Sequence, residues 1–517
     1  MTKNNRPIIA RFIRKIYHFS WIPGTRGAMM FFLVLGCLVS PPADAAINIP
    51  ITVNLSETVD VTGTPHIPVD VGGVTRYASY TSGTGTNTLT FTLAPQPGDV
   101  DLDGVTVSSP IDLNGGAIKD TKGNDATLTF TPPNTTNVKV NYPSLSLDFT
   151  YDADGRYTFN GTAYNDLSSF LAATGGTFSR SGTGTYFDSA GVMQTAATNS
   201  PRFDFDPITH TPKGILIEEA RKNLLTYSDQ FNNVIWSANT STISPNVSVA
   251  PDSSNTADEW ISNAGSTTHY LAQPYTQTSG TIYTLSVWVK SATGINQTFK
   301  LFQQNLTATS NITATPQWQR FTFTNTATSS ATLKFGLTRD SSNNAVDLYV
   351  WGAQLETGPF PTSYIPTTST TVTRNADLFT IPTTGGWFNA ATGSFLGQFE
   401  EASALNTGGT SRIFGTSLSG RFAYRPSSST AFNIYDGTNA AGSTAQPQNS
   451  LIKISSSYGP AGLRISSNGT PPGTATFSGT WGNQGYAWVA YLFTGHVSKY
   501  KYYPSQVSTP QLQLLSQ

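Results

Sequence analysis

The chain has 517 residues, of which 38% are hydrophobic and 12% aromatic, so it can bury sizeable cores and is not intrinsically disordered. Charged residues make up only 11%, against about 25% in ordinary soluble proteins, and the net charge of −1 argues against a nucleic-acid-binding protein. Abundant Ser, Thr, Asn and Gly are typical of an all-β chain. At roughly 150 residues per domain, the length predicts three or four domains.

A secretory signal peptide is predicted over residues 1–45. Basic residues precede an apolar stretch at 28–40, and Ala-Asp-Ala follows at 43–45. The apolar stretch is shorter than the roughly 20 residues that span a bilayer, so we expect no transmembrane span after cleavage and a secreted or cell-surface protein. Cleavage removes Cys37, the one cysteine. An uncleaved anchor and a lipidation site at Cys37 are the alternatives.

Residues 46–142 are predicted to form a small β-sandwich, because short alternating runs such as 49–55 and 88–93 are separated by turns about every ten residues. The blocks VTGTP (61–65), GDVDLDG (98–104) and LNGG followed by DTKGN (113–124) resemble a bacterial Ig-like domain found in large secreted adhesins. That resemblance implies a spacer or attachment module.

Residues 143–228 show little regular pattern and are predicted to be an irregular connector. The stretches FSRSGTGTYFDSAG (178–191) and GILIEEARKNLL (214–225) resemble the segment that precedes the binding modules of phage tail-fibre proteins.

Three strands are predicted within residues 229–375, at 283–290, 318–324 and 346–352, because large apolar residues alternate there with polar ones. The ending GAQLETG (352–358), followed by TSYIPT (362–367), resembles the close of a jelly-roll module of the carbohydrate-binding-module-like group. The resemblance implies a jelly roll.

Residues 376–517 resemble a concanavalin A-like (laminin G-like) sandwich, on the stretches WFNAATGSFLGQFE (387–400) and GHVSKYKYYP (495–504). Ser508 with Gln511 three residues later forms a capping-box pattern, and Pro510 suits a first helical turn, so a short closing helix is predicted. The fold class is thus a multidomain all-β chain of sandwiches behind a signal peptide.

A calcium site is predicted at Asp99, Asp101 and Asp103, which alternate before Gly104 and offer the oxygen ligands that Ca²⁺ prefers. Pro110 stands where an EF-hand would place its bidentate glutamate, so the remaining ligands would come from elsewhere, with Asp120 as the candidate. A solvated acidic turn is the alternative. No other cofactor is predicted.

Enzyme signatures are lacking. The mature chain has four histidines, no His-Glu-x-x-His pair, no Gly-x-Ser-x-Gly elbow and no phosphate-binding loop. Glu400 and Glu401 are neighbours on a predicted strand, so their side chains point to opposite faces and cannot share a glycosidase site. We therefore predict a non-enzymatic protein, with a glycoside hydrolase assembled from distant residues not excluded.

Aromatic residues are candidates for sugar contact, because a flat ring covers the apolar face of a pyranose while neighbouring amides bind its hydroxyls. Trp288, Trp318 and Trp351 lie in alternating strands and are interpreted as core. Residues in turn-rich stretches are the predicted ligand-binding set: Trp236, Trp260, Tyr270 and Tyr275.

The predicted function is a secreted or cell-surface adhesin whose C-terminal sandwiches bind a glycan or another surface ligand. A phage or prophage tail-fibre protein and a structural subunit of an extracellular filament are the alternatives. A homo-oligomer is compatible with each, although no heptad repeat enforces one.

Overall fold

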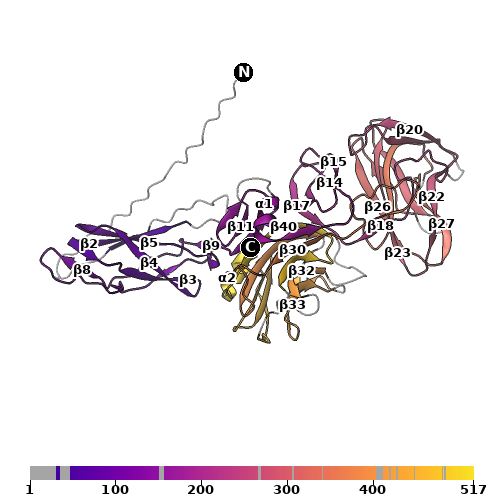
Figure 1. Cartoon of the computed structure of the whole chain (residues 1–517). Helices are drawn as coiled ribbons and strands as arrows, with labels where there is room; N and C mark the ends of the chain where they lie inside the picture. Colours follow the sequence, from indigo (N-terminus) through magenta and orange to yellow (C-terminus); the bar gives the residue numbers. More distant parts are fainter. Residues whose placement is uncertain are drawn as a thin grey trace, which may run out of the picture.

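The computed structural model describes residues 31–34, 47–150, 156–265, 269–304, 308–340, 342–402, 411–417, 421–426, 429–447, 449–479, 481 and 485–517. Strands hold 51% of the residues and helices 3%, so the prediction of a multidomain all-β chain is confirmed. Three units lie side by side (Figure 1). The predicted signal peptide lies outside the described residues, apart from strand β1 (Phe31–Val34).

The N-terminal unit, residues 47–142 with β1 added, is built on a seven-stranded antiparallel sheet in the order β1-β2-β5-β4-β3-β7, with β8 also pairing with β2. A two-stranded sheet of β6 and β9 completes the unit. Alternate residues of β3 and β5 are buried, which is the period of two that the sequence shows. The strands are β2 (Ile49–Thr62), β3 (His66–Val71), β4 (Val74–Ser82), β5 (Thr86–Leu93), β6 (Asp99–Asp101), β7 (Thr106–Val107), β8 (Ala117–Asp120) and β9 (Val140–Tyr142).

The second unit, which we call the inserted sandwich, packs two five-stranded antiparallel sheets against each other. One sheet contains β19 (Ser237–Asn239), β22 (Tyr270–Gln277), β27 (Ala331–Arg339), β24 (Gln297–Gln303) and β25 (Ile312–Ala314), in that order. The other contains β20 (Thr242–Ser248), β21 (Ala257–Ser262), β28 (Val346–Thr357), β23 (Ile282–Ser291) and β26 (Gln319–Thr326). The three strands predicted here correspond to β23, β26 and β28.

The third unit, the C-terminal sandwich, has a ten-stranded and a seven-stranded sheet around one apolar core. The larger sheet contains, in order, β12 (Thr162–Tyr164), β11 (Tyr157–Phe159), β10 (Leu145–Asp148), β40 (Gly495–Tyr503), β31 (Gly393–Glu401), β36 (Leu451–Tyr458), β37 (Leu463–Ser467) and β38 (Gly473–Ala475). Strand β17 (Pro212–Ile217) also pairs with β40, and β16 (Phe203–Phe205) pairs with β17. The smaller contains β13 (Thr177–Ser179), β30 (Leu378–Pro382), β39 (Tyr486–Tyr491), β32 (Ser411–Ser417), β33 (Arg421–Arg425), β34 (Ala431–Tyr435) and β35 (Ala440–Ala445).

The C-terminal sandwich is discontinuous in sequence. Its two sheets contain strands from residues 145–217 as well as from 378–503, and Figure 1 shows the purple strands among the orange and yellow ones. Residues 143–228 were predicted to be an irregular connector, but they contribute strands to this sandwich instead. Its strands are short, and β10, β13 and β17 pair with β30 or β40, more than 150 residues away, so no local repeat reveals them. The intervening residues form the inserted sandwich.

A two-stranded neck carries the insertion. Strand β18 (Arg221–Asn223) enters the inserted sandwich, and β29 (Val372–Arg374) leaves it antiparallel to β18. Just before the neck, the hairpin of β14 (Gly184–Phe187) and β15 (Met193–Ala196) projects between the two sandwiches (Figure 1).

Two short helices are present among the described residues. Helix α1 (Leu167–Thr174) is capped by Asp166, which accepts a hydrogen bond from the Ser169 backbone N–H. The predicted closing helix is confirmed as α2 (Thr509–Leu515), whose cap Ser508 accepts from the backbone N–H of Gln511. The Gln511 side chain turns instead toward the N-terminal unit, where its Oε1 accepts from the Leu102 backbone N–H at 2.6 Å.

Candidate functional site

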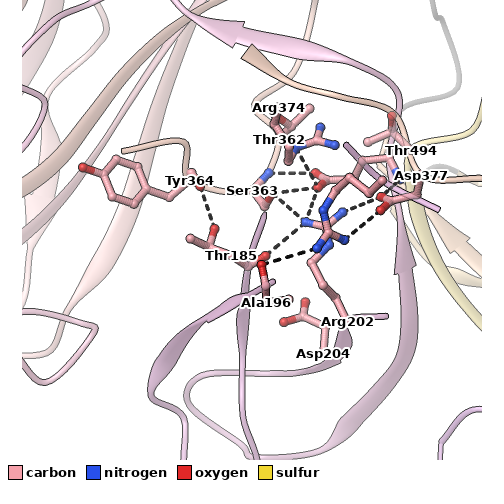
Figure 2. A network of polar contacts seen from close by, with 12 residues as sticks. Thr185, Ala196, Arg202, Asp204, Thr362, Ser363, Tyr364, Arg374, Asp377 and Thr494 are labelled. Atoms are coloured by element: carbon pink, nitrogen blue, oxygen red, sulfur yellow. Dashed lines mark hydrogen bonds and ion pairs between the residues drawn. The ribbon is translucent and has the colours of Figure 1, made fainter. Parts of the chain in front are cut away.

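Five charged side chains form a buried network beside the neck (Figure 2). Arg202 donates from Nη1 to Glu218 Oε2 at 2.7 Å and from Nη2 to Asp377 Oδ2 at 2.5 Å. Arg180 donates to Asp377 Oδ1 at 3.0 Å, and Arg374 Nε lies 3.4 Å from Glu218 Oε2. All five side chains are almost completely buried. The network thus links the residues next to the ends of β13, β16, β17 and β30 with the neck strand β29.

The inserted sandwich reaches the network through Ser363, whose backbone N–H donates to Glu218 Oε1 and whose hydroxyl donates to Glu218 Oε2, both at 2.7 Å. Burial alone would raise the pKa of Glu218, but the charges of Arg374 and Arg202 and the Ser363 hydrogen bonds outweigh burial and hold that pKa well below its ordinary value. Glu218 is therefore ionised, and both of its oxygens are satisfied.

An open cleft of about 340 Å³ lies next to this network, at the junction of the two sandwiches. Its lining comes from the β14–β15 hairpin, from β23, β26 and residues 360–364 of the inserted sandwich, and from β17, β31 and β40 of the C-terminal sandwich. Small-molecule sites fall within about 300–1,000 Å³ and favour the boundaries between domains. The size and position therefore suit a ligand.

Aromatic rings supply much of the apolar lining of the cleft: Tyr186, Phe187, Trp288 and Phe360. The Phe187 and Trp288 rings meet edge to face, with centroids 5.5 Å apart and an interplanar angle of 64°. Trp288 is 6% exposed, so its ring position is fixed by packing. Phe187 is half-buried and presents more of its surface to solvent. Such surfaces suit the apolar face of a sugar ring.

Charged side chains at the same cleft are held in pairs. His496 Nε2 lies 2.7 Å from Asp204 Oδ2, and Lys213 Nζ lies 3.5 Å from Glu400 Oε2. The second oxygen of Asp204 accepts from the backbone N–H of Phe187 at 2.6 Å. These pairs fix the positions of groups that can exchange hydrogen bonds with ligand hydroxyls.

Two of the four predicted ligand-binding aromatics are buried in the inserted sandwich, so that part of the prediction is wrong. Trp260 is 0% exposed on β21, and Trp236 is 5% exposed. The Trp236 ring packs against Phe231 at 4.7 Å, and its Nε1 donates to the Tyr227 carbonyl at 2.9 Å. The polar residues around both tryptophans in the sequence pointed to surface positions, although both rings face inward.

The other two predicted aromatics lie on β22 with opposite orientations. Tyr275 packs into the core beside Tyr283 and Phe335. Tyr270 is half-buried on the outer face, where Lys334 Nζ lies 4.5 Å from its ring centroid and 2.5 Å from its hydroxyl. The structure does not bring Tyr270 and Tyr275 together, and neither lines the cleft.

The four predicted calcium ligands are not brought together either. Asp99 is bound by the guanidinium of Arg76, with Nε 3.0 Å from Oδ1, and Asp120 lies in a separate turn where it accepts from Asn124. Within the described part of the chain, no group of three or more His, Cys, Asp or Glu side chains is arranged to hold a metal. The geometry therefore gives the calcium prediction no support.

Asp101 and Asp103 serve instead as acceptors at the joint with α2. The amide of Gln511 donates to Asp101 Oδ1 at 3.1 Å and also to Asp103. Burial raises the pKa of Asp101. Apolar side chains close the joint: Val100, Leu102, Tyr503, Val507, Leu512 and Leu515. Residues 99–104 thus anchor the N-terminal unit to α2 of the C-terminal sandwich.

Glu400 and Glu401 point to opposite faces of β31, as the sequence predicts. Glu400 faces the cleft beside Lys213, whereas Glu401 is 4% exposed and is bound by Arg425 and Ser411. The adjacent pair cannot act on one substrate.

Sequence reasoning missed most of the cleft. Phe187, Phe360 and His496 lie more than 130 residues from one another in the chain, and no motif connects them. Trp288 was interpreted as core; it is buried but also borders the cleft. The insertion brings these residues together, and nothing local in the sequence signals it.

No protein family matches the chain, and no curated protein does. Among solved structures it is similar to the N-terminal CBM22-1–CBM22-2 tandem domain of Xyn10C from Paenibacillus barcinonensis, at 9% identity and a TM-score of 0.22, over 56% of this chain and 98% of that chain. It is also similar to the M60 catalytic domain with CBM51-1 and CBM51-2 of ZmpB from Clostridium perfringens, at 10% identity and a TM-score of 0.17.

The second similarity spans 93% of this chain and 56% of the other. Both of these proteins contain tandem carbohydrate-binding modules. TM-scores this low do not establish a common fold, so no functional argument rests on either similarity. Separately, neither described helix is long enough to cross a bilayer.

Proposed function

We propose that this chain binds glycans in the cleft between its inserted and C-terminal sandwiches. The observation that carries the proposal is the combination of aromatic rings and fixed polar groups in one open cleft of about 340 Å³. Phe187 and Tyr186, both half-buried, offer ring surfaces, while His496 and Asp204 offer hydrogen-bonding atoms nearby. Sugar rings need both kinds of contact, because one face is apolar and the rim is hydroxylated.

The chain acts in this proposal as a non-enzymatic, secreted or cell-surface adhesin. The basic and apolar N-terminal pattern with Ala-Asp-Ala at 43–45 supports export. The N-terminal unit then serves as a spacer, anchored through the contacts of Gln511 with residues 101–103. The buried charge network beside the cleft links the inserted and C-terminal sandwiches. We therefore expect the two sides of the binding surface to keep a fixed position relative to each other.

The phage tail-fibre and filament alternatives make different predictions for the N-terminus. An exported adhesin is expected to accumulate outside cells as a chain beginning at Ala46. N-terminal sequencing of the protein from culture medium checks this. The untrimmed chain inside virus particles would favour the tail-fibre alternative, and regular fibres of purified protein in electron micrographs would favour the filament.

Replacing Phe187 with alanine is expected to weaken glycan retention by about tenfold or more, because a ring that faces the cleft is lost. The measurement is a glycan array probed with the full chain and with Phe187→Ala. The matched control is Tyr270→Ala, which removes a half-buried ring from the outer face of β22, outside the cleft. Loss of binding in the Tyr270 variant with full binding in the Phe187 variant would place the site elsewhere.

A further inference from the structure

Two buried N–H donors at the cleft have no acceptor. Trp288 on β23 and Arg320 on β26 lie directly opposite each other, and both line the cleft. The Nε1 atom of Trp288 and the Nε atom of Arg320 are buried and have no hydrogen-bond partner within the described residues. A buried donor left unpaired costs about 1–3 kcal/mol, so native proteins rarely keep one without a reason.

The rest of the Arg320 guanidinium is bound by neutral groups only. Its Nη1 donates to the Thr362 carbonyl at 2.6 Å, and its Nη2 donates to the Ser286 hydroxyl at 2.9 Å. These bonds fix the plane of the guanidinium, and no carboxylate is among its direct hydrogen-bond partners. Its Nε–H is the remaining donor on a side chain that stays protonated.

The charge balance around the cleft leaves Arg320 without a direct counter-ion. The other ions here pair with one another: Lys213 with Glu400, and Asp204 with His496. In the part of the chain that the structure describes, no carboxylate lies within 4.0 Å of the Arg320 nitrogens. Glu356 and Glu218 act on the guanidinium only through the longer-range attraction of their charges, without direct contact.

We infer that the cleft selects acidic sugars, whose carboxylate accepts hydrogen bonds from Trp288 Nε1 and Arg320 Nε. This inference rests on the proposed function, since it names the chemical class of glycan bound at the same cleft. A carboxylate only accepts hydrogen bonds, and its two oxygens match two donors from facing strands. It also brings a negative charge into direct contact with the Arg320 guanidinium. A neutral hydroxyl could accept from both donors through its two lone pairs, but it would bring no negative charge to the guanidinium.

The test compares sugars that differ only in this charge. The full chain is titrated calorimetrically with the methyl glycosides of glucuronate, galacturonate and N-acetylneuraminate, and with the methyl ester of each. At least one acid is expected to bind about tenfold or more tightly than its ester, since a charge-assisted hydrogen bond contributes about 1.5–3 kcal/mol. The member of the set that binds distinguishes a uronate from a sialate.

A matched pair of tryptophan variants assigns the contact. Trp288→Phe keeps an aromatic ring, though a smaller one, and removes the N–H, so it is expected to weaken binding of the acid about tenfold and leave binding of the ester unchanged. Trp318→Phe is the control on the same sheet, because the Trp318 Nε1 already donates to the Val249 carbonyl at 3.0 Å. Trp318→Phe is expected to bind the acid as the wild-type protein does.

Other outcomes overturn the inference. Equal affinity for an acid and its ester, with both weakened by Phe187→Ala, would overturn acid selection while leaving glycan binding in the cleft intact. If no acidic sugar in the set binds, acid selection is also wrong. The glycan array then decides the proposed function by itself, because it presents neutral glycans as well.

Discussion

Replacing Arg202 with methionine is expected to lower the free energy of unfolding of the C-terminal sandwich by about 3–5 kcal/mol. Arg202 binds Glu218 and Asp377 at 2.7 and 2.5 Å, and all three side chains are almost fully buried. Methionine fills similar space but leaves the two carboxylates short of one positive charge in a poorly solvated place. Urea unfolding of the full chain measures the change.

The control for Arg202→Met is Lys119→Met in the N-terminal unit. Lys119 pairs with Asp125 at 2.6 Å, but the side chains are 45% and 81% exposed. An exposed pair contributes about 1 kcal/mol or less, so this variant is expected to unfold almost as the wild type does. An equally small effect for Arg202→Met would show that the network does not hold the neck.

Replacing Trp260 with alanine is expected to cost about 3–5 kcal/mol in the inserted sandwich. The ring is fully buried among the core residues of that unit, so its removal leaves a cavity between the two sheets. Thermal unfolding of the full chain measures the loss. Protein that remains folded is expected to bind glycans as the wild type does, because Trp260 does not line the cleft.

Tyr270→Ala is again the comparison, since Tyr270 lies on the outer face of the same unit and is half-buried. We expect a cost of about 1 kcal/mol for that change. If instead Trp260→Ala were stable and lost glycan binding, the ring would have to face a ligand, and the sequence-based assignment would be right.

The sequence predicts strands well where alternation is local. Strands β23, β26 and β28 each combine large apolar residues with polar ones at a period of two, and all three form where expected. Half-buried and exposed residues alternate along most of β26, whereas β23 is buried on both faces, polar Thr284 and Ser286 included. The closing helix was also predictable, because Ser508 and Gln511 form a cap within four residues. In both cases the information lies within a few neighbouring residues.

The discontinuous sandwich could not be predicted in this way. Strand β10 pairs with β40, so Leu145 lies opposite Tyr502. A strand as short as β10 carries too few residues to show a period, and its pairing depends on a partner at the far end of the chain. Local composition misled the prediction at Trp260 for a related reason: the polar neighbours Asp258 and Ser262 on β21 are themselves buried, so their polarity does not mark a surface position.

The cleft depends on that same long-range arrangement. Trp288 comes from the inserted sandwich and His496 from the C-terminal sandwich, so neither unit forms the site by itself. The buried network at the neck holds the two units in the relation that the cleft requires. The central claim is that ligand binding belongs to the junction of the two sandwiches and not to the outer face of either.

A crystal structure of the full chain with a glycan selected from the array tests this claim most directly. We predict that the sugar lies in the cleft, against Phe187 and within hydrogen-bonding distance of Trp288 Nε1. A sugar bound on the outer face of β22 beside Tyr270, with the cleft empty, would contradict the account.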